Sequence, residues 1–253
     1  MIKILPIVGL LLFVSACEGE KKTENKEPQK TNTLETTATD KDTITFTLED
    51  IDEKSYCRLV EKAGYCKKNG FGSWAQDSLN EIKLLKDNRR VVKRKGNKLT
   101  FTIGKNNLEY KNVRDEMSGE YVIYRLVDMN DEYAVLALLY YEGHEYMVLN
   151  HKTGKSFKTW GRPIFNASKS MVASGNYDLA AGYSNNGLQV FTNENGKWDL
   201  KMARLLDDWG PSGLWWVNDS VIASMKNRMI ETSKGATDTT TFVKILLKKE
   251  KIN

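Results

Sequence analysis

The chain has 253 residues, 40% of them apolar and 28% charged, which leaves room for one large all-β domain or two small domains. Its four prolines and the lack of a dominant repeat exclude a collagen-like or wholly disordered chain, and its one long apolar run, at the N-terminus, excludes an internal transmembrane helix. The net charge of +5 is modest for this length and does not indicate nucleic-acid binding.

Residues 1–16 have the organisation of a secretory signal peptide. Lys3 supplies the positive start, Ile4–Val14 form an apolar core, and Ser15 and Ala16 are the small residues that precede a cleavage site. An apolar core of this length is too short to cross a hydrocarbon layer of about 30 Å as a helix. We therefore expect a cleaved signal and not a membrane-spanning anchor.

The residue after this signal is Cys17, and Val14-Ser15-Ala16-Cys17 resembles the lipobox of bacterial lipoproteins. The resemblance implies that Cys17 becomes the first residue and carries a diacylglycerol and an amide-linked acyl chain, because several chains hold a protein at a membrane durably. The alternative is a secreted protein in which a cysteine merely follows the cleavage site. Glu18-Gly19-Glu20-Lys21 is similar to the acidic stretch after the cysteine of Bacteroidota lipoproteins. We expect lipid anchoring in the cell envelope, on the periplasmic or surface face of the outer membrane.

Residues 17–43 differ sharply in composition from the rest of the chain. From Glu18 to Thr43 there is one leucine and no aromatic residue, so this stretch cannot bury enough apolar area to offset its conformational entropy. We expect a disordered tether at 17–43 and a β-rich domain at 44–253.

Short strands dominate the expected domain. Apolar and polar residues alternate at Ile44–Leu48 and Leu99–Ile103, as is typical of half-buried strands. Further strands are expected at Tyr121–Val127, Tyr133–Tyr141, Tyr146–Leu149, Ser156–Trp160, Met171–Ser174, Leu179–Tyr183, Leu188–Phe191, Trp198–Ala203, Leu214–Val217, Val221–Ser224 and Thr240–Leu247. Turn residues separate them about every 8–12 positions, which indicates an all-β fold. Helix is expected only between Asp50 and Lys86, where apolar residues recur at helical spacing.

Several phrases of the C-terminal part resemble β-propeller blades. Tyr146–Asn150 with the turn Lys152-Thr153-Gly154 is similar to a blade strand and its turn, and Phe165–Ser174 resembles the phrase F-S-P-D-G-K-x-x-A of such blades. At roughly 40–45 residues per blade, the resemblance implies about five blades. The stretch from Trp160 to Asn218 is also similar to bacterial lipoproteins, which implies no activity. A twisted β-sandwich is the alternative fold.

Cys57 and Cys66 would be the remaining cysteines of the mature chain. Disulfides persist outside the cytoplasm, so we expect a structural bridge, which would stabilise the fold by about 2–3 kcal/mol in the chain-entropy model. Eight residues separate the two cysteines, unlike the spacing of a redox pair. Free thiols are the alternative.

The two histidines, His144 and His151, bracket one expected hairpin. Their separation of seven residues places them on opposite faces of a strand, which argues against joint metal binding. We expect His151 to be exposed beside the turn. Since the chain also contains no G-x-S-x-G phrase, we predict no metal, no cofactor and no catalytic residue.

Aromatic and acidic loop residues are the candidates for binding. They are Trp209, Trp215, Trp216, Asp178, Asp207 and Asp208. Tryptophans at a domain rim can contact sugars or peptides, although burial in a core is their commoner fate. Carboxylates in loops most often cap turns, and a facing pair would instead suit glycoside hydrolysis.

The run Lys83–Lys98 holds eight basic residues, including Arg89-Arg90 and Lys93-Arg94-Lys95. One interpretation is a patch for anionic lipopolysaccharide, lipid headgroups or an acidic partner. The other is a solvated edge strand, because lysines at an edge discourage association between sheets.

Together these patterns predict a non-enzymatic envelope lipoprotein. It would be held at the membrane by Cys17, and its β domain would bind a protein, peptide or glycan, with no nucleic acid as partner. The alternative is an envelope glycan or peptide hydrolase that uses Asp178 and Asp207-Asp208.

Overall fold

The computed structural model describes residues 42–61, 74–115, 119–233 and 235–251. These ranges are mostly strand, and all strand pairs are antiparallel, which confirms the all-β prediction. The helices α1 (Glu53–Glu61) and α2 (Trp74–Asp87) lie where helix was predicted. The expected signal peptide and the tether as far as Lys41 lie outside the described residues, and the first described strand begins at Asp42.

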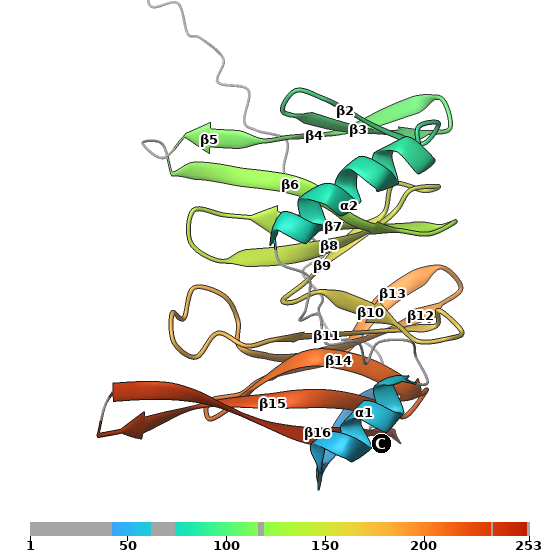
Figure 1. The fold of residues 1–253 in the computed structure, drawn as a ribbon. Helices are drawn as coiled ribbons and strands as arrows, with labels where there is room; N and C mark the ends of the chain where they lie inside the picture. The colour runs from blue at the N-terminus through green and yellow to red at the C-terminus, as the bar shows by residue number, and fades with distance from the viewer. Residues whose placement is uncertain (1–41, 62–73, 116–118, 234, 252–253) are drawn as a thin grey trace, which may run out of the picture. The chain divides into compact units, whose positions relative to one another are not determined.

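The described strands form four sheets (Figure 1), whereas the repeat length predicted about five blades. The first sheet consists of β2 (Val92–Lys95), β3 (Lys98–Ile103) and β4 (Asn106–Lys111). The second consists of β5 (Val113–Asp115), β6 (Glu120–Met129), β7 (Tyr133–Leu139), β8 (His144–Asn150) and β9 (Ser156–Thr159). The third consists of β10 (Pro163–Phe165), β11 (Met171–Asn176), β12 (Gly187–Glu194) and β13 (Lys197–Leu205). The fourth is β14 (Gly210–Asn218), β15 (Val221–Thr232), β16 (Gly235–Lys251) and β1 (Asp42–Ile51). Each sheet is a meander in chain order, except that β1 pairs with β16 along its whole length. The first and last described strands therefore complete one sheet.

The β5–β9 sheet is buried on both faces. On one face, Leu126 and Leu136 pack in a cluster with Phe101 of the β2–β4 sheet. On the other face, Val135 lies in a cluster that Phe165 of β10 packs against. Because neighbours cover both faces, β7 has six consecutive buried residues and no polar alternation.

A separate cluster joins the β10–β13 sheet to the β1/β14–β16 sheet. Ala173 and Val190 contribute from the former, and Ile222, Ile245 and Ile44 from the latter, each at most 4% exposed. The period of two in the sequence places these side chains on one face of each sheet. The four sheets are therefore joined face to face, in chain order, by apolar side chains.

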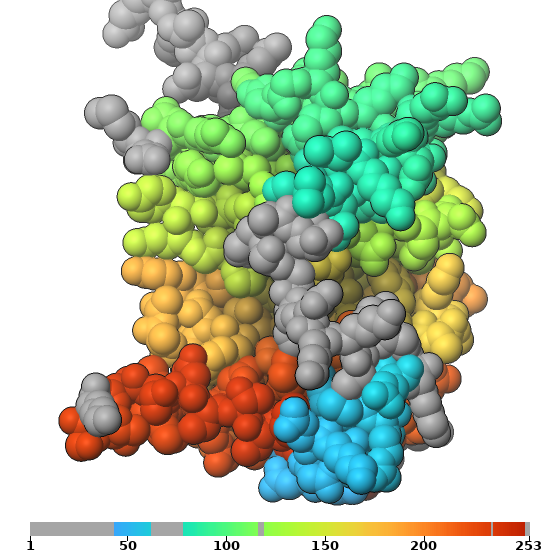
Figure 2. Space-filling model, in the orientation of Figure 1, coloured from blue at the N-terminus to red at the C-terminus, as the bar shows by residue number. Residues whose placement is uncertain are grey.

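Both helices pack against the sheets. In α1, Asp52 caps the N-terminus by accepting a hydrogen bond from the Ser55 N–H at 2.6 Å, and buried Tyr56 donates through its hydroxyl to the Gly213 carbonyl at 2.9 Å. α2 packs against β6, on the face of the molecule seen in Figure 2. It ends where the Asn88 amide donates to the carbonyl of Leu84.

Candidate functional site

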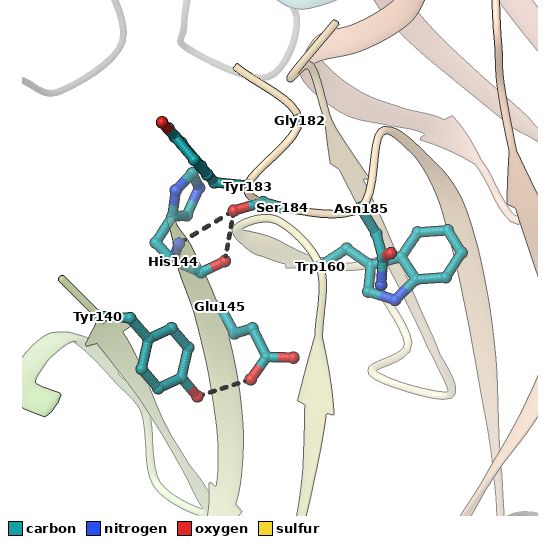
Figure 3. A pocket seen from close by; sticks show the side chains of 8 residues that line it. All are labelled: Tyr140, His144, Glu145, Trp160, Gly182, Tyr183, Ser184 and Asn185. Atoms are coloured by element: carbon teal, nitrogen blue, oxygen red, sulfur yellow. Dashed lines mark hydrogen bonds between the residues drawn. The ribbon is translucent and has the colours of Figure 1, made fainter. Parts of the chain in front are cut away.

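A cavity of about 420 Å³ opens where β8 begins (Figure 3). Its lining comes from the end of β7, the start of β8, the end of β9 and the loop between β11 and β12, and consists of Tyr140, His144, Glu145, Trp160, Gly182, Tyr183, Ser184 and Asn185. Aromatic rings beside a few polar groups are the usual composition of a ligand site.

The loop of residues 177–186 forms one wall of the cavity. The strand predicted at Leu179–Tyr183 is wrong, because the Asp178 carboxylate accepts hydrogen bonds from the backbone N–H groups of Gly182 at 3.1 Å and Ser184 at 2.6 Å. These bonds fold the segment back on itself instead of pairing it with a strand. Asp178, predicted as a binding residue, therefore shapes the wall and does not line the cavity itself.

Ser184 attaches this wall to β8. The backbone N–H of His144 donates to Ser184 Oγ at 3.0 Å, and the Ser184 hydroxyl donates to the His144 carbonyl at 3.2 Å. The approach is close, since a Cβ at Gly143 would lie 2.8 Å from Ser184 Oγ, and Gly143 also has a φ of 86°. Glycine is required at position 143 for both reasons.

A carboxylate network forms the floor of the cavity. Glu145 Oε2 accepts hydrogen bonds from the Tyr140 hydroxyl at 2.7 Å and from Lys158 Nζ at 2.8 Å, while Lys158 also donates to the Tyr140 oxygen at 3.1 Å. The strand register places the three side chains on the same face of the sheet. From the described residues, both bonds to the carboxylate reach Oε2, which leaves Oε1 to a ligand. Oε1 points toward the Trp160 and Asn185 side of the cavity (Figure 3).

This network raises the pKa of both Tyr140 and Lys158. Burial and the hydrogen bond to Glu145 raise the pKa of Tyr140 to about 12, so the phenol keeps its proton and donates it. Burial alone would lower the pKa of Lys158, but its bonds to Glu145 and Tyr140 outweigh burial and the net shift is upward. The lysine is therefore a cation that holds the carboxylate in place.

His144 lies on the opposite face of β8 from Glu145. Burial lowers the pKa of His144, and the charges of Asp178 and Glu145 oppose only part of this effect. Its ring meets Tyr146 edge-on, with 5.8 Å between the ring centroids. The histidine therefore presents a neutral ring at neutral pH.

The tryptophans predicted to bind a ligand do not form one rim. Trp209 is only 4% exposed and lies under the ammonium of Lys226, which is 5.5 Å from its ring centroid, so the core alternative holds for this residue. Trp215 and Trp216 are half-buried and adjacent in β14, so they point to opposite faces. Trp216 donates through Nε1 to the Ile164 carbonyl at 3.0 Å.

The predicted acidic loops are brought together by a residue that the sequence did not single out. Asn186 accepts a hydrogen bond from the Asp178 N–H at 3.0 Å and donates to the Trp209 carbonyl at 2.9 Å. Asp207 and Asp208 are exposed and do not line the cavity. None of the three aspartates lines the cavity, and the Asp178 carboxylate is engaged by the backbone of its own loop.

The remaining sequence predictions have mixed outcomes. Cys57 is half-buried on α1 and has no disulfide partner among the described residues, while Cys66 and Cys17 lie outside them, so bridge and lipidation stay predictions. The expected exposure of His151 is wrong: its side chain is buried, with Nε2 2.9 Å from the Asn130 carbonyl oxygen.

Sequence reasoning missed most of the cavity lining. The predicted strands Tyr133–Tyr141 and Ser156–Trp160 contain Tyr140 and Trp160, and no sequence pattern singles out Glu145. The available signal was Gly143 beside a histidine and a carboxylate, because a glycine between two strands marks a tight turn and a close approach of another segment.

The described part of the chain offers neither a metal site nor a membrane-spanning helix. No group of three or more His, Cys, Asp or Glu side chains in the described ranges could hold a metal ion. Neither described helix is long and apolar enough to cross a membrane. In comparisons with known proteins, no protein-family model, no curated protein and no solved structure matches this chain.

Proposed function

We propose that this protein binds a glycan in the cavity at the start of β8, as a lipid-anchored component of the cell envelope. The observation that carries the proposal is the Glu145 carboxylate, which Tyr140 and Lys158 hold in place within the aromatic lining. A sugar ring has apolar C–H faces that pack on aromatic rings and hydroxyls that donate to carboxylates. The cavity offers both kinds of partner.

The geometry favours a glycan over a folded protein partner. A cavity of about 420 Å³ has the size of small-ligand sites and is too small for the standard contact area of a protein interface. Asn185 and Ser184 add an amide and a hydroxyl to the wall opposite Glu145, so hydroxyls could be bound from two sides.

Binding can be tested with the chain from Glu18 to Asn253, which retains every described helix and strand. Calorimetric titration with envelope oligosaccharides should show binding that Glu145→Gln weakens about tenfold or more, because hydrogen bonds to a charged acceptor are roughly twice as strong as neutral ones. Glu109→Gln is the matched control, because Glu109 forms a similar 2.8 Å ion pair with Lys98 away from the cavity. Equal binding by the Glu145→Gln and Glu109→Gln variants would refute the site.

Incubation with the same oligosaccharides distinguishes a binding protein from a hydrolase. Hydrolysis of glycosides needs two carboxylates that face one another across the substrate. Turnover that is lost in Glu145→Gln, Asp178→Asn or Asp208→Asn would replace the binding function by the alternative, an envelope hydrolase. Stable oligosaccharide after prolonged incubation supports a binder.

The membrane attachment rests on Val14–Cys17, which resembles a lipobox. Cys17→Ser should release the protein from the membrane pellet or leave the precursor uncut. A normally processed Cys17→Ser protein that stays in the pellet would contradict lipidation.

We propose a propeller-like arrangement of the four sheets, which would also require the β2–β4 sheet to meet the β1/β14–β16 sheet. Each sheet is an antiparallel meander, consecutive sheets pack face to face, and β1 completes the sheet of β14–β16. Radial repetition of such sheets leaves only short, protected edges. A crystal structure with a central channel would support this arrangement, and two sheets packed as a closed sandwich would refute it.

A further inference from the structure

α2 has an exposed face whose composition is unusual for a helix on a soluble domain. Leu79 and Ile82 are 64% and 67% exposed, and Lys83 and Lys86 lie beside them at helical spacing. The opposite face of α2, with Leu84 and Leu85, packs into the apolar cluster of the β5–β9 sheet. α2 therefore presents two large aliphatic side chains and two cations on one outward stripe.

Further exposed cations follow α2, in the turn after it and in β2. Arg89, Arg90, Lys93 and Lys95 are all exposed, and Asp87 is the one acidic residue between Lys83 and Lys95 in the sequence. Together with Lys83 and Lys86 they make six cations, and none of the six forms an ion pair with any described residue. We call Leu79, Ile82, Lys83, Lys86, Arg89 and Arg90, which belong to α2 and the turn after it, the α2 face.

We infer that the α2 face binds the surface of an anionic phospholipid bilayer. Leu79 and Ile82 would enter the boundary between headgroups and acyl chains, and the surrounding lysines and arginines would contact lipid phosphates. This contact is separate from both the glycan cavity and the acyl chains at Cys17. It would add a second attachment that fixes which side of the domain faces the membrane.

The apolar pair favours a bilayer over a soluble polyanion or an acidic protein. Lysines on an edge strand prevent association between sheets, and arginines in a turn can bind any phosphate. Neither role accounts for two neighbouring aliphatic side chains that are more than half exposed. Helices that lie in a membrane interface likewise combine apolar side chains, which insert, with lysines and arginines, which contact the headgroups.

The test is vesicle co-sedimentation with the chain from Glu18 to Asn253, which lacks the apolar run Ile4–Val14 and Cys17. Vesicles of phosphatidylcholine with about one third phosphatidylglycerol should sediment the protein at low salt, at least tenfold more than pure phosphatidylcholine. Raised ionic strength should reduce the bound fraction, because salt screens exposed charges. No difference between the two vesicle compositions would overturn the inference.

Two double variants separate the contributions of charge and apolar insertion. Lys83→Glu/Arg90→Glu should reduce binding at least tenfold, and Leu79→Gln/Ile82→Gln should also reduce it several-fold, because both contributions are needed. All four side chains are exposed, so circular dichroism should show unchanged folding.

A control variant on α1 and a soluble polyanion test whether the α2 face itself, and a bilayer as its partner, account for binding. Lys54→Glu/Arg58→Glu makes the same charge change on the exposed surface of α1 and should leave binding unchanged. Equal loss in this control would show that net charge alone, and not the α2 face, drives binding. If Leu79→Gln/Ile82→Gln binds vesicles like the unaltered chain, while Lys83→Glu/Arg90→Glu binds neither vesicles nor soluble polyphosphate, the α2 face is a polyanion site and the bilayer inference is wrong.

Discussion

A nearly buried ion pair attaches α2 to the sheets, and its removal should be costly. Glu81 Oε1 accepts a hydrogen bond from Arg94 Nη2 at 2.7 Å and another from the Leu126 N–H at 2.8 Å, while Arg94 Nη2 also donates to the Tyr124 carbonyl at 2.6 Å. The side chains of Arg94 and Glu81 are 17% and 14% exposed. The pair therefore connects α2, β2 and β6.

The expected magnitude follows from what each substitution leaves behind. Glu81→Ala leaves the Arg94 charge mostly buried and the Leu126 N–H without its acceptor, and breaking a buried pair in this way costs about 3–5 kcal/mol. We expect about 3 kcal/mol, because both side chains keep some contact with water. Glu81→Gln keeps an acceptor but loses the charge, so about 1–2 kcal/mol is expected.

The measurement is urea unfolding followed by circular dichroism, with Glu109→Gln as the control. The Glu109–Lys98 ion pair has a similar length of 2.8 Å, but its side chains are 46% and 44% exposed, so its loss should cost at most about 1 kcal/mol. If Glu81→Ala and Glu109→Gln unfold within about 0.5 kcal/mol of each other, burial does not decide the contribution of these pairs and the reasoning fails. A double-mutant cycle with Arg94→Ala should then also give no coupling.

Three further predictions concern packing and pH. Gly161→Ala should lower the free energy of unfolding by about 3 kcal/mol in urea titrations, because its Cβ would lie 2.0 Å from the Gly175 carbonyl oxygen; a near-neutral effect would contradict this geometry. Burial and a hydrogen bond to Asp238 raise the pKa of Tyr177 to about 12, so between about pH 10 and 12 the folded chain keeps a proton that the unfolded chain loses, and stability should fall with rising pH, less so in Tyr177→Phe. Burial lowers the pKa of His144 from 6.5, so stability should fall as pH drops below about 6.5, and a His144→Gln variant with an equally steep pH dependence would disprove it.

Local patterns in the sequence predicted much of the fold. Alternation at Ile44–Leu48 and Leu99–Ile103 correctly marks β1 and β3, and the helical spacing between Asp50 and Lys86 correctly marks both helices. The prediction failed where a side chain replaced a strand partner, since Asp178 binds the backbone of its own loop. The periodicity of apolar residues does not reveal such a bond, because the apolar residues of the loop still have the spacing of a strand.

The cavity could not be predicted because its walls come from distant parts of the chain. Ser184 and His144 are 40 residues apart, and only the packing of the β10–β13 sheet on the β5–β9 sheet brings them together. Trp209 is likewise buried by a residue distant in sequence, Lys226 of β15, although its residue type also allowed a position on a rim. Sequence identifies the residue types that suit a site, while contacts between sheets decide which of them meet.

The basic run Lys83–Lys98 shows within a few residues that contacts, and not residue type, decide the role of a side chain. Arg94 points inward to Glu81, and its neighbours Lys93 and Lys95 point outward, because successive residues of β2 face opposite sides. A variant that neutralised the whole run would lose stability through Arg94 and surface charge through the two lysines at once. Membrane binding by the α2 face must therefore be tested with the exposed cations alone, and the attachment of α2 with Glu81 and Arg94 alone. If changes at Lys93 and Lys95 shifted the unfolding midpoint as far as Glu81→Ala does, the division of the run into structural and surface cations would be wrong.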